Sequence, residues 1–304
     1  MKAENQKHDC VYGFVVLHYI AEDMTKECVR RILALFSSEN IKIVVVDNAS
    51  PNGSGARIKE YFAESDVVTT ILSSENLGFA KGNNLGFDLL KNEYNPDFMI
   101  VMNNDVLISD ACFLRKVSEL YNNNQYAVLA PDINNPRLSK HQNPFSIKGL
   151  EKNDVEQIYR KLKKNSEHFL VTFFCSHIKD KIRFNKFIRR LYEFFKYGIL
   201  KKENLYKKEL RNIVPHGSCL IFSRNFISKR KYAFNPCTFL YFEENILYQE
   251  CITSGLDILY SPVVFVDHLE DVSTGKVFNS DLKKERYKLK QMIKSCKVFL
   301  DLFD

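Results

Sequence analysis

One apolar stretch of the chain ends in side chains that could bind a metal ion. Residues 98–102 are hydrophobic, and Asn103, Asn104 and Asp105 follow them directly. A carboxylate fixed at the end of a buried strand is a rigid, hard oxygen ligand of the kind that holds Mg²⁺ or Mn²⁺. The same residues could instead form a turn that caps the strand, with Asp110 near the start of the next helix. The motif alone leaves both interpretations open.

Three glycines at four-residue spacing, Gly78, Gly82 and Gly86, fall within a stretch that is expected to be helical. Glycine in a helix interior costs about 1 kcal/mol relative to alanine, so the spacing indicates a smooth helix face that another group approaches closely. That group is either a ligand or the sheet. Asn76 lies just before the helix and could cap it, and a helix N-terminus also favours a diphosphate.

Two adjacent acids, Glu243 and Glu244, follow an aromatic run and precede a second stretch with helical character. Acids in the first turn of a helix stabilise it through the helix dipole. A carboxylate in a partly dry cleft can also act as a general base and take a proton from an attacking hydroxyl. The pair by itself does not decide between a cap and a base.

The elements that must position these residues alternate along the first 130 positions, which predicts an α/β fold with a mostly parallel sheet. The expected strands are residues 14–19, 43–46, 67–72 and 98–102, and the expected helices are 25–36, 55–63, 78–92 and 110–121. Ligands of open α/β sheets bind beyond the carboxyl ends of the strands. We therefore expect His18, Asp47, Asn76 and Asp105 to converge along one rim.

The net charge of +7 is concentrated in one segment of the 304-residue chain. Residues 148–211 contain 18 Lys and Arg against 8 Asp and Glu, a net +10 that leaves −3 for the rest. Interleaved aromatic residues leave three interpretations of this segment: an anionic lipid surface, RNA, or a solvated helical face without a partner. Residues 277–304 predict an amphipathic helix, which either docks on the domain or lies on a surface.

Other global features favour a cytoplasmic protein. The eight cysteines form no C-x-x-C pair, which is typical of small core residues in a reducing compartment. The polar N-terminus leads straight into a strand, and no apolar run approaches the roughly 20 residues that span a bilayer.

Taken in order, these motifs resemble family 2 glycosyltransferases of bacterial surface-polysaccharide clusters. The resemblance covers residues 12–135 and 213–276, and it is carried by VVLHYI, IVVVDNAS, NLGFAKGNNLG, VMNNDV, GSCLIF, TFLYFEENIL and VVFVDHLEDVST. It implies a GT-A fold, in which a Rossmann-like, mostly parallel central sheet is flanked by helices, here with a basic helical insertion. It also implies an inverting transfer of a sugar from a nucleotide diphosphate donor, assisted by Mn²⁺ or Mg²⁺.

The resemblance also assigns roles to individual residues. Asp105 and His268 would hold the metal, although Asn103 stands where relatives often carry a further aspartate. Glu244 would be the catalytic base beside Glu243, although Ile246 replaces an acid found in many relatives. The residues implied to bind the donor are His18, Tyr19, Asp47, Asn48, Asn76, Gly78, Asn84, Asn104 and Asp105.

The expected organisation is a nucleotide-sugar-binding half at residues 1–136, a basic insertion or lid at 137–212, an acceptor-side half at 213–276 and a C-terminal helix at 277–304. The expected donor is UDP- or dTDP-linked, and the expected acceptor is a saccharide, lipid-linked in a growing surface polysaccharide. A cytoplasmic protein, peripheral on the inner face of the plasma membrane, fits these partners, with no nucleic acid. The alternatives are a non-catalytic binding module for sugar nucleotides or polysaccharides, and a nucleotidyltransferase, which would need an N-terminal triphosphate-binding loop that we do not find.

Overall fold

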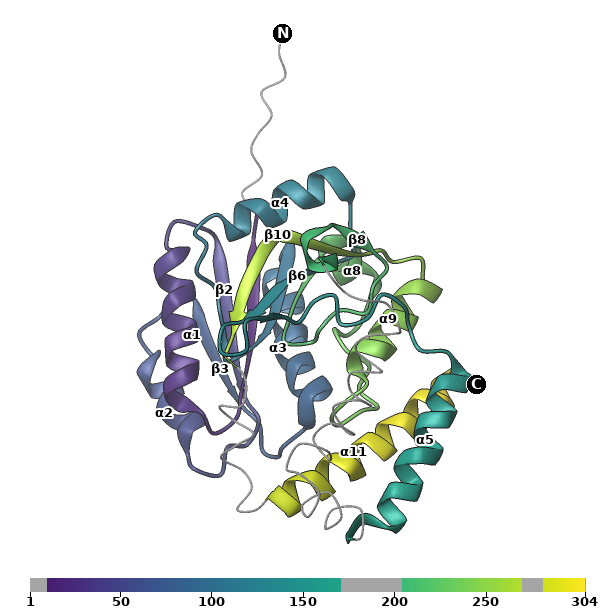
Figure 1. The fold of residues 1–304 in the computed structure, drawn as a ribbon. Helices are drawn as coiled ribbons and strands as arrows, with labels where there is room; N and C mark the ends of the chain where they lie inside the picture. Colours follow the sequence, from purple (N-terminus) through teal and green to yellow (C-terminus); the bar gives the residue numbers. More distant parts are fainter. Residues whose placement is uncertain (1–9, 171–203, 270–280, 304) are drawn as a thin grey trace.

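A computed structural model describes residues 10–170, 204–269 and 281–303, and within these ranges a single sheet of ten strands carries helices on both faces (Figure 1). The order of the main strands across the sheet is β3-β2-β1-β4-β9-β6-β10-β5, with β7 paired to β6 and β8 paired to β10. The strands are β1 (Tyr12–His18), β2 (Ile41–Asp47), β3 (Val68–Leu72), β4 (Phe98–Asn103), β5 (Val106–Leu107), β6 (Val128–Asn135), β7 (Lys140–His141), β8 (Leu210–Arg211), β9 (Cys219–Ser223) and β10 (Ile258–His268).

The four N-terminal strands end along one edge of the sheet. They are parallel, and the register places His18 opposite Asp47 and Leu17 opposite Asn103. Asp47 in turn lies opposite Leu72, the last residue of β3. The polar residues that follow these strands therefore share an edge, as the alternation of strands and helices predicts.

Strand β9 runs antiparallel between β4 and β6. Its first residue, Cys219, pairs with Met102 near the end of β4, so the segment before β9 lies at the edge where β1 to β4 end. The sheet is therefore mixed, with its reversed strand inserted at the centre.

The apolar runs ILY and VVFV near the end of the sequence belong to a single strand, β10. Its register against β6 shifts between Ser261 and Phe265. Pro262 lies in the shift, and because proline has no N–H to donate, the ladder is interrupted there without the strand ending. The continuous strand brings its last residue, His268, to the same edge of the sheet.

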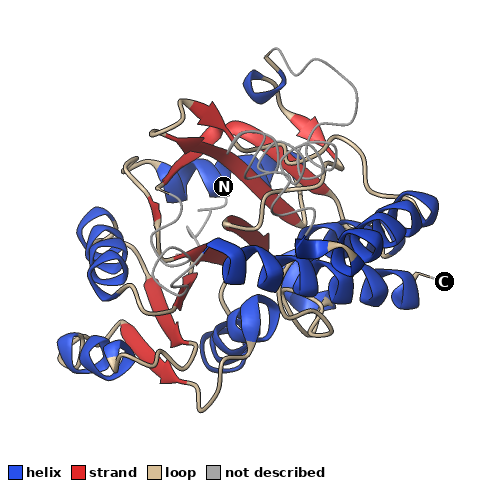
Figure 2. Ribbon diagram, turned by 60° about the horizontal axis from the view of Figure 1, so that its bottom comes forward, coloured by secondary structure: helices blue, strands red, loops and turns tan. Residues whose placement is uncertain are grey.

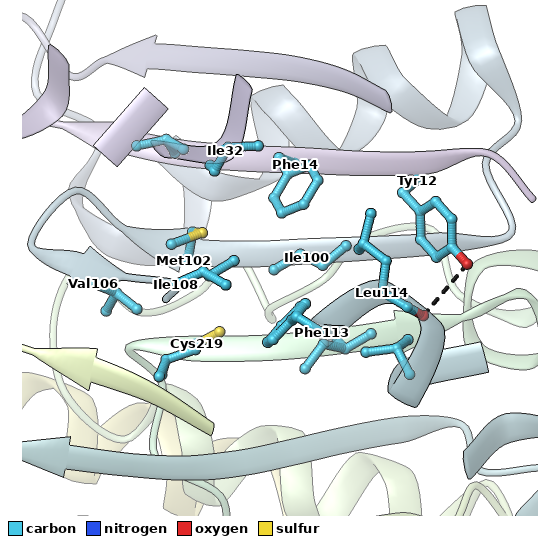
Figure 3. Packing of buried hydrophobic residues seen from close by; sticks show 14 of the residues in the cluster. Tyr12, Phe14, Ile32, Ile100, Met102, Val106, Ile108, Phe113, Leu114 and Cys219 are labelled. Atoms are coloured by element: carbon cyan, nitrogen blue, oxygen red, sulfur yellow. Dashed lines mark hydrogen bonds between the residues drawn. The ribbon is translucent and has the colours of Figure 1, made fainter. Parts of the chain in front are cut away.

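Helices cover the sheet in two layers. One core lies between the sheet and α1, α2 and α4, and Figure 3 shows Phe14, Ile100 and Phe113 at its centre. The second core lies against α3, α8 and α9 on the other face. The helices are α1 (Glu22–Leu35), α2 (Ser54–Tyr61), α3 (Gly78–Tyr94), α4 (Phe113–Asn124), α5 (Lys152–Glu167), η1 (Leu205–Lys207), α8 (Arg224–Lys229), α9 (Glu243–Thr253) and α11 (Asp281–Leu302).

A third apolar cluster joins α5 to α11, which lie side by side outside the sheet (Figures 1 and 2). It includes Leu162 of α5 and Leu289 and Phe299 of α11. The C-terminal helix, for which the sequence allowed two locations, thus docks on the domain. The basic run at residues 183–202, predicted to be helical, lies outside the described residues.

Two global observations complete the fold. The seven cysteines in the described part of the chain are free thiols. Of the helices described, none is long and apolar enough to cross a membrane.

Candidate active site

Asp105 and His268 meet at the end of the sheet because β5 and β10 pair. The antiparallel ladder sets His268 opposite Val106, and the backbone N–H of Leu269 donates to the carbonyl of Asp105 at 3.0 Å. As a result His268 Nε2 lies 3.3 Å from Asp105 Oδ1, and both side chains are at least nine-tenths buried. The sequence places these residues 163 positions apart, and the fold makes them neighbours.

This pair fits a divalent cation. Asp105 Oδ1 is buried and has no hydrogen-bond partner in the described part of the molecule, which leaves an acceptor unsatisfied. His268 Nδ1 lies 2.8 Å from Gln142 Oε1, and because an amide oxygen can only accept, Nδ1 carries the proton. In the neutral ring, Nε2 then turns its lone pair toward the carboxylate. Two electron-rich atoms facing each other are compatible when a cation lies between them.

The described residues supply only part of a coordination shell. Across residues 10–170, 204–269 and 281–303, no three His, Cys, Asp or Glu side chains gather into a metal site. A cation at Asp105 and His268 would take its remaining ligands from water and substrate phosphates, as Mg²⁺ commonly does.

His18 lies behind the rim and not on it. The side chain is fully buried, with Nδ1 2.7 Å from Thr25 Oγ1 and Nε2 2.7 Å from Ser54 Oγ. Burial lowers the pKa of His18 from 6.5 to about 4, so the ring is neutral at physiological pH. His18 thus ties β1 to α1 and α2 beneath the rim, and its expected place at the edge of the nucleotide pocket stays a prediction.

The same threonine connects His18 to the metal candidate. Thr25 Oγ1 lies 2.8 Å from Asn104 Nδ2, which donates to it. Asn104 is buried and precedes Asp105, so this hydrogen bond fixes the backbone that carries the carboxylate. The buried network therefore runs from His18 through Thr25 to Asn104.

Asp47 and Asn48 shape the loop after β2. Asp47 accepts hydrogen bonds from the backbone N–H and the hydroxyl of Ser50. Asn48 accepts from the N–H of Leu77 at 2.8 Å and donates to the carbonyl of Gly78 at 2.9 Å, so it clamps the entrance to α3. Both side chains lie at the expected rim, and both are largely buried.

The glycine helix packs against the sheet and not against an open cleft. A Cβ on Gly82 would lie 2.8 Å from Leu17 Cδ1, and one on Gly86 would lie 2.6 Å from Val15 Cγ1. Gly78 has φ +77°, and a Cβ there would lie 2.2 Å from the carbonyl oxygen of Phe239. The spacing allowed either a ligand or the sheet to approach this helix face closely, and at Gly82 and Gly86 it is the sheet.

The other residues expected to bind the donor differ in exposure. Asn76 is exposed, and its Oδ1 accepts from the N–H of Gly78 at 3.0 Å, but the N-cap position of α3 is Leu77 and not Asn76. Tyr19 is half-buried beside the rim. Asn84 instead uses its amide on the backbone N–H and carbonyl of Phe234. Its side chain therefore joins two segments of the protein.

Glu243 and Glu244 begin α9 and lie in different surroundings. Glu243 is buried, its Oε1 has no hydrogen-bond partner among the described residues, and burial together with the neighbouring Glu244 raises its pKa to about 8. Glu244 is half-buried, burial raises its pKa, and its Oε1 accepts from the N–H of Gly217 at 3.2 Å. Burial therefore favours the neutral form of both acids, which titrate as a coupled pair, and Glu243 is the more deeply buried of the two.

The segment before β9 connects the acid pair to the metal candidate. The imidazole rings of His216 and His268 pack edge to face, with centroids 5.7 Å apart. The next residue is Gly217, whose N–H reaches Glu244, and a Cβ on this glycine would lie 2.8 Å from Glu244 Oε1. Contacts therefore run without a break from Asp105 through the two histidines and Gly217 to Glu244.

The sequence did not single out the residues that complete this connection. They are buried polar side chains and one backbone N–H, most of which have a partner far away in the chain, and the local signal was a histidine and glycine close before a strand. These residues are Thr25, Ser54, Gln142, His216, Gly217 and Ser218.

Comparisons with known proteins agree with this architecture. The sequence profile described as "Glycosyl transferase family 2" matches residues 14–230. Curated proteins offer no match to the chain. Among matching solved structures is the mannosyltransferase PcManGT from Pyrobaculum calidifontis in complex with GDP-Man and Mn²⁺, with a TM-score of 0.52 and 11% identity over 97% of this chain and 70% of that chain. The predicted α/β fold of the GT-A type is therefore confirmed.

Proposed function

This chain belongs to glycosyl transferase family 2, and from that premise we propose that it moves a sugar from a nucleoside diphosphate to a saccharide hydroxyl with inversion at the anomeric carbon. The observation that carries the proposal is the unbroken set of contacts from Asp105 to Glu244. A cation on the leaving diphosphate and a base on the attacking hydroxyl must act on one carbon, so the groups that supply them must share one site.

Glu244 is the proposed base. Its raised pKa brings it closer to neutrality, where a general base combines the ionised form with useful proton affinity. The N–H of Gly217 orients the carboxylate by donating to Oε1. Glu243 is the more deeply buried acid, and its pKa is raised to about 8, so we assign the proton of this coupled pair to Glu243 and the negative charge to Glu244.

Asp105 and His268 are the proposed ligands of Mn²⁺ or Mg²⁺, and the unsatisfied Oδ1 of Asp105 supports this assignment. A cation there would compensate the charge that develops on the departing diphosphate. Asn103 adds a neutral amide where a second carboxylate would stand, so Asp105 is the proposed carboxylate ligand from this motif.

The donor is proposed to lie along the rim formed by Tyr19, Asp47 and Asn76, with its base near Asp47. The resemblance favours a uridine or thymidine nucleotide, whereas PcManGT is in complex with GDP-Man. A guanosine donor therefore belongs in any test.

The acceptor is proposed to be a growing, lipid-linked surface polysaccharide at the inner face of a membrane. The exposed face of α11 supports this, because basic residues recur on it every three or four positions: Lys283, Arg286, Lys290, Lys294 and Lys297. Each such residue contributes about 1 kcal/mol near an anionic leaflet. We expect the protein to float with anionic liposomes at low salt and to lose this binding at high salt. The double substitution Lys290→Glu and Lys294→Glu is expected to weaken the binding. Flotation that ignores both salt and these substitutions would count against the surface.

We propose that residues 1–136 bind the donor and that residues 213–276 form the acceptor side of the domain. Gly217, His216 and the α9 acids all come from the second segment, which supports its assignment to the acceptor side. We propose that residues 137–212 form an insertion or lid. Residues 277–304 form the C-terminal helical segment.

The deciding experiment is a panel of UDP-, dTDP- and GDP-sugars incubated with the purified chain and Mn²⁺, with release of free nucleotide as the readout. We expect one donor class to be hydrolysed slowly without acceptor, and Asp105→Asn to abolish the Mn²⁺-dependent part. Nucleotide binding without any release or transfer would favour the non-catalytic binding module instead.

A further inference from the structure

The turn that carries the proposed base has a backbone that its own residues do not favour. Tyr241 and Phe242 immediately precede Glu243, and their φ angles are +73° and +71°. Neither residue is a glycine, so each Cβ is crowded against the backbone in this left-handed conformation. Two such residues in succession persist only when the surrounding structure holds them in place.

Contacts from α11 hold this turn. Ser295 Oγ donates to the carbonyl of Leu240 at 2.7 Å, and Ser295 is 2% exposed. The ring of Phe299, one turn further along α11, packs against Phe242 with centroids 6.1 Å apart. Both contacts come from one face of α11 and reach residues directly before the acid pair.

The apolar cluster shared with α5 anchors these contacts. Phe242 and Ile246 lie in the same buried cluster as Val155 and Leu162 of α5 and Phe299 of α11. The side chain of Phe242, which the turn directs into this cluster, is thus buried between α5 and α11. Removing the cluster would leave the left-handed residues without the packing that offsets their strain.

The other end of the turn is fixed to the donor side. The N–H of Phe79, at the start of α3, donates to the carbonyl of Phe239 at 2.8 Å. Gly78 allows this approach, since any Cβ there would collide with the same carbonyl. The turn is therefore held between the helix that begins at the donor rim and the C-terminal helix.

We propose that α11 is a positioning element for the reaction: Ser295 and Phe299 hold the strained turn at Tyr241 and Phe242, and the turn sets the position of Glu244. This inference rests on the proposed function of Glu244 and extends it to a helix outside the sheet. Ser295 and Phe299 act through the turn and touch no substrate themselves.

The test is Ser295→Ala, compared with Ser223→Ala as a matched control. Ser223 is also a buried serine, and its Oγ donates to the carbonyl of Tyr126 at 2.6 Å, but it lies opposite Phe98 at the other end of the sheet. Both substitutions remove one buried hydrogen bond, so both are expected to lower the melting temperature. Only Ser295→Ala is expected to disturb the turn.

Two measurements separate the variants. Hydrogen exchange of a peptide covering residues 240–247 is expected to accelerate in Ser295→Ala and to stay unchanged in Ser223→Ala. The kcat for transfer is expected to fall about 10-fold in Ser295→Ala with little change in KM for the donor, because a base displaced by a fraction of an ångström loses alignment. Phe299→Leu, which retains an apolar side chain but loses the ring, provides a second variant with the same expected pattern.

The outcomes are distinct. Equal exchange and equal kcat in Ser295→Ala and Ser223→Ala would overturn the proposal, as would faster exchange without any change in kcat. If the unsubstituted chain transfers no sugar from any donor, the proposed function fails, whereas the exchange comparison still decides whether α11 holds the turn.

Discussion

Two polar regions of the molecule differ in how completely their hydrogen bonds are made. In the first region, defined as residues 18–25 and 47–54, His18 uses both ring nitrogens, and Asp47 accepts from Ser50. In the reactive strip, defined as Asp105, His216, His268, Glu243 and Glu244, the atoms Asp105 Oδ1 and Glu243 Oε1 are buried without a hydrogen-bond partner in the described residues.

This difference separates residues that make a shape from residues that await a ligand or a proton. A buried polar atom without a partner costs roughly 1–3 kcal/mol, so a protein retains one where it is used. The first region uses its polar groups to hold loops and helix entrances, as with His18 and Asn48. The strip keeps two unsatisfied oxygen atoms, and that of Asp105 lies beside His268. The comparison leads to four predictions, from the largest expected effect to the smallest.

Within the strip, Glu244→Gln should have the largest effect. The amide cannot take a proton, so transfer should fall by about 10²-fold or more, while the affinity for the donor stays nearly constant. Steady-state kinetics together with calorimetric titration of the nucleotide measure the two quantities. The neighbouring Glu243→Gln is the matched control, and it should retain most of the transfer activity because Glu243 is the acid to which we assign the proton of the pair. Loss of activity on Glu243→Gln but not on Glu244→Gln would exchange their roles.

At the cation end of the strip, Gln142→Leu should weaken the binding of Mn²⁺ by about 10- to 100-fold, the usual effect of removing the residue that orients a metal-binding histidine. Leucine has a similar volume but no acceptor for His268 Nδ1–H. Titration of Mn²⁺ followed by electron paramagnetic resonance measures the affinity without requiring turnover.

Gln142→Glu is the control for this change because it keeps an acceptor in the same position. It should preserve most of the affinity for Mn²⁺. Equal weakening in both variants would show that the proton on Nδ1 does not matter.

Behind the rim, Gly86→Ala should destabilise the fold by about 1–2 kcal/mol. Overpacking costs about 1–3 kcal/mol, and the gain in helix propensity offsets up to about 1 kcal/mol of this cost. The added methyl group would meet Val15 Cγ1 at 2.6 Å. Urea denaturation measures the change, and Leu85→Ala, on the exposed side of the same helix, should change stability by less than about 0.5 kcal/mol. If the Gly86→Ala variant were as stable as the parent, α3 could move away from the sheet enough to accommodate a methyl group without loss of unfolding free energy.

The fourth prediction concerns stability as a function of pH, where the two regions have opposite signs. Burial raises the pKa of Glu243 from 4.5 to about 8, so its contribution to stability is fully present below pH 4.5 and is lost as the pH rises through 8. Burial lowers the pKa of His18 from 6.5 to about 4, so its contribution is present above pH 6.5 and is lost as the pH falls through 4.

Glu243→Gln should therefore flatten the decline in stability between pH 5 and pH 8 and leave the loss at acid pH in place. Urea denaturation at several pH values measures both limbs. An unchanged slope between pH 5 and pH 8 would show that Glu243 is ionised in the folded state.

The sequence by itself determined β1 to β4, the helices α1 to α4 and the edge at which these four strands end. Alternation of apolar and polar residues is a local property, and turn-forming residues such as those after Asp47 report where strands stop. The same information placed Asp105 and Glu244 at element ends, since each lies directly beside a change of periodicity. The order of motifs then identified the family.

Only the tertiary structure decided which side chains meet. His268 reaches Asp105 through pairing of β5 with β10, and Gly217 reaches Glu244 through the reversed strand β9. Glycine spacing alone could not tell a ligand from the sheet, because both require the same smooth helix face. The place of α11 was equally undetermined, since an amphipathic helix buries its apolar face against any apolar partner, and only the fold supplies α5 and the strained turn.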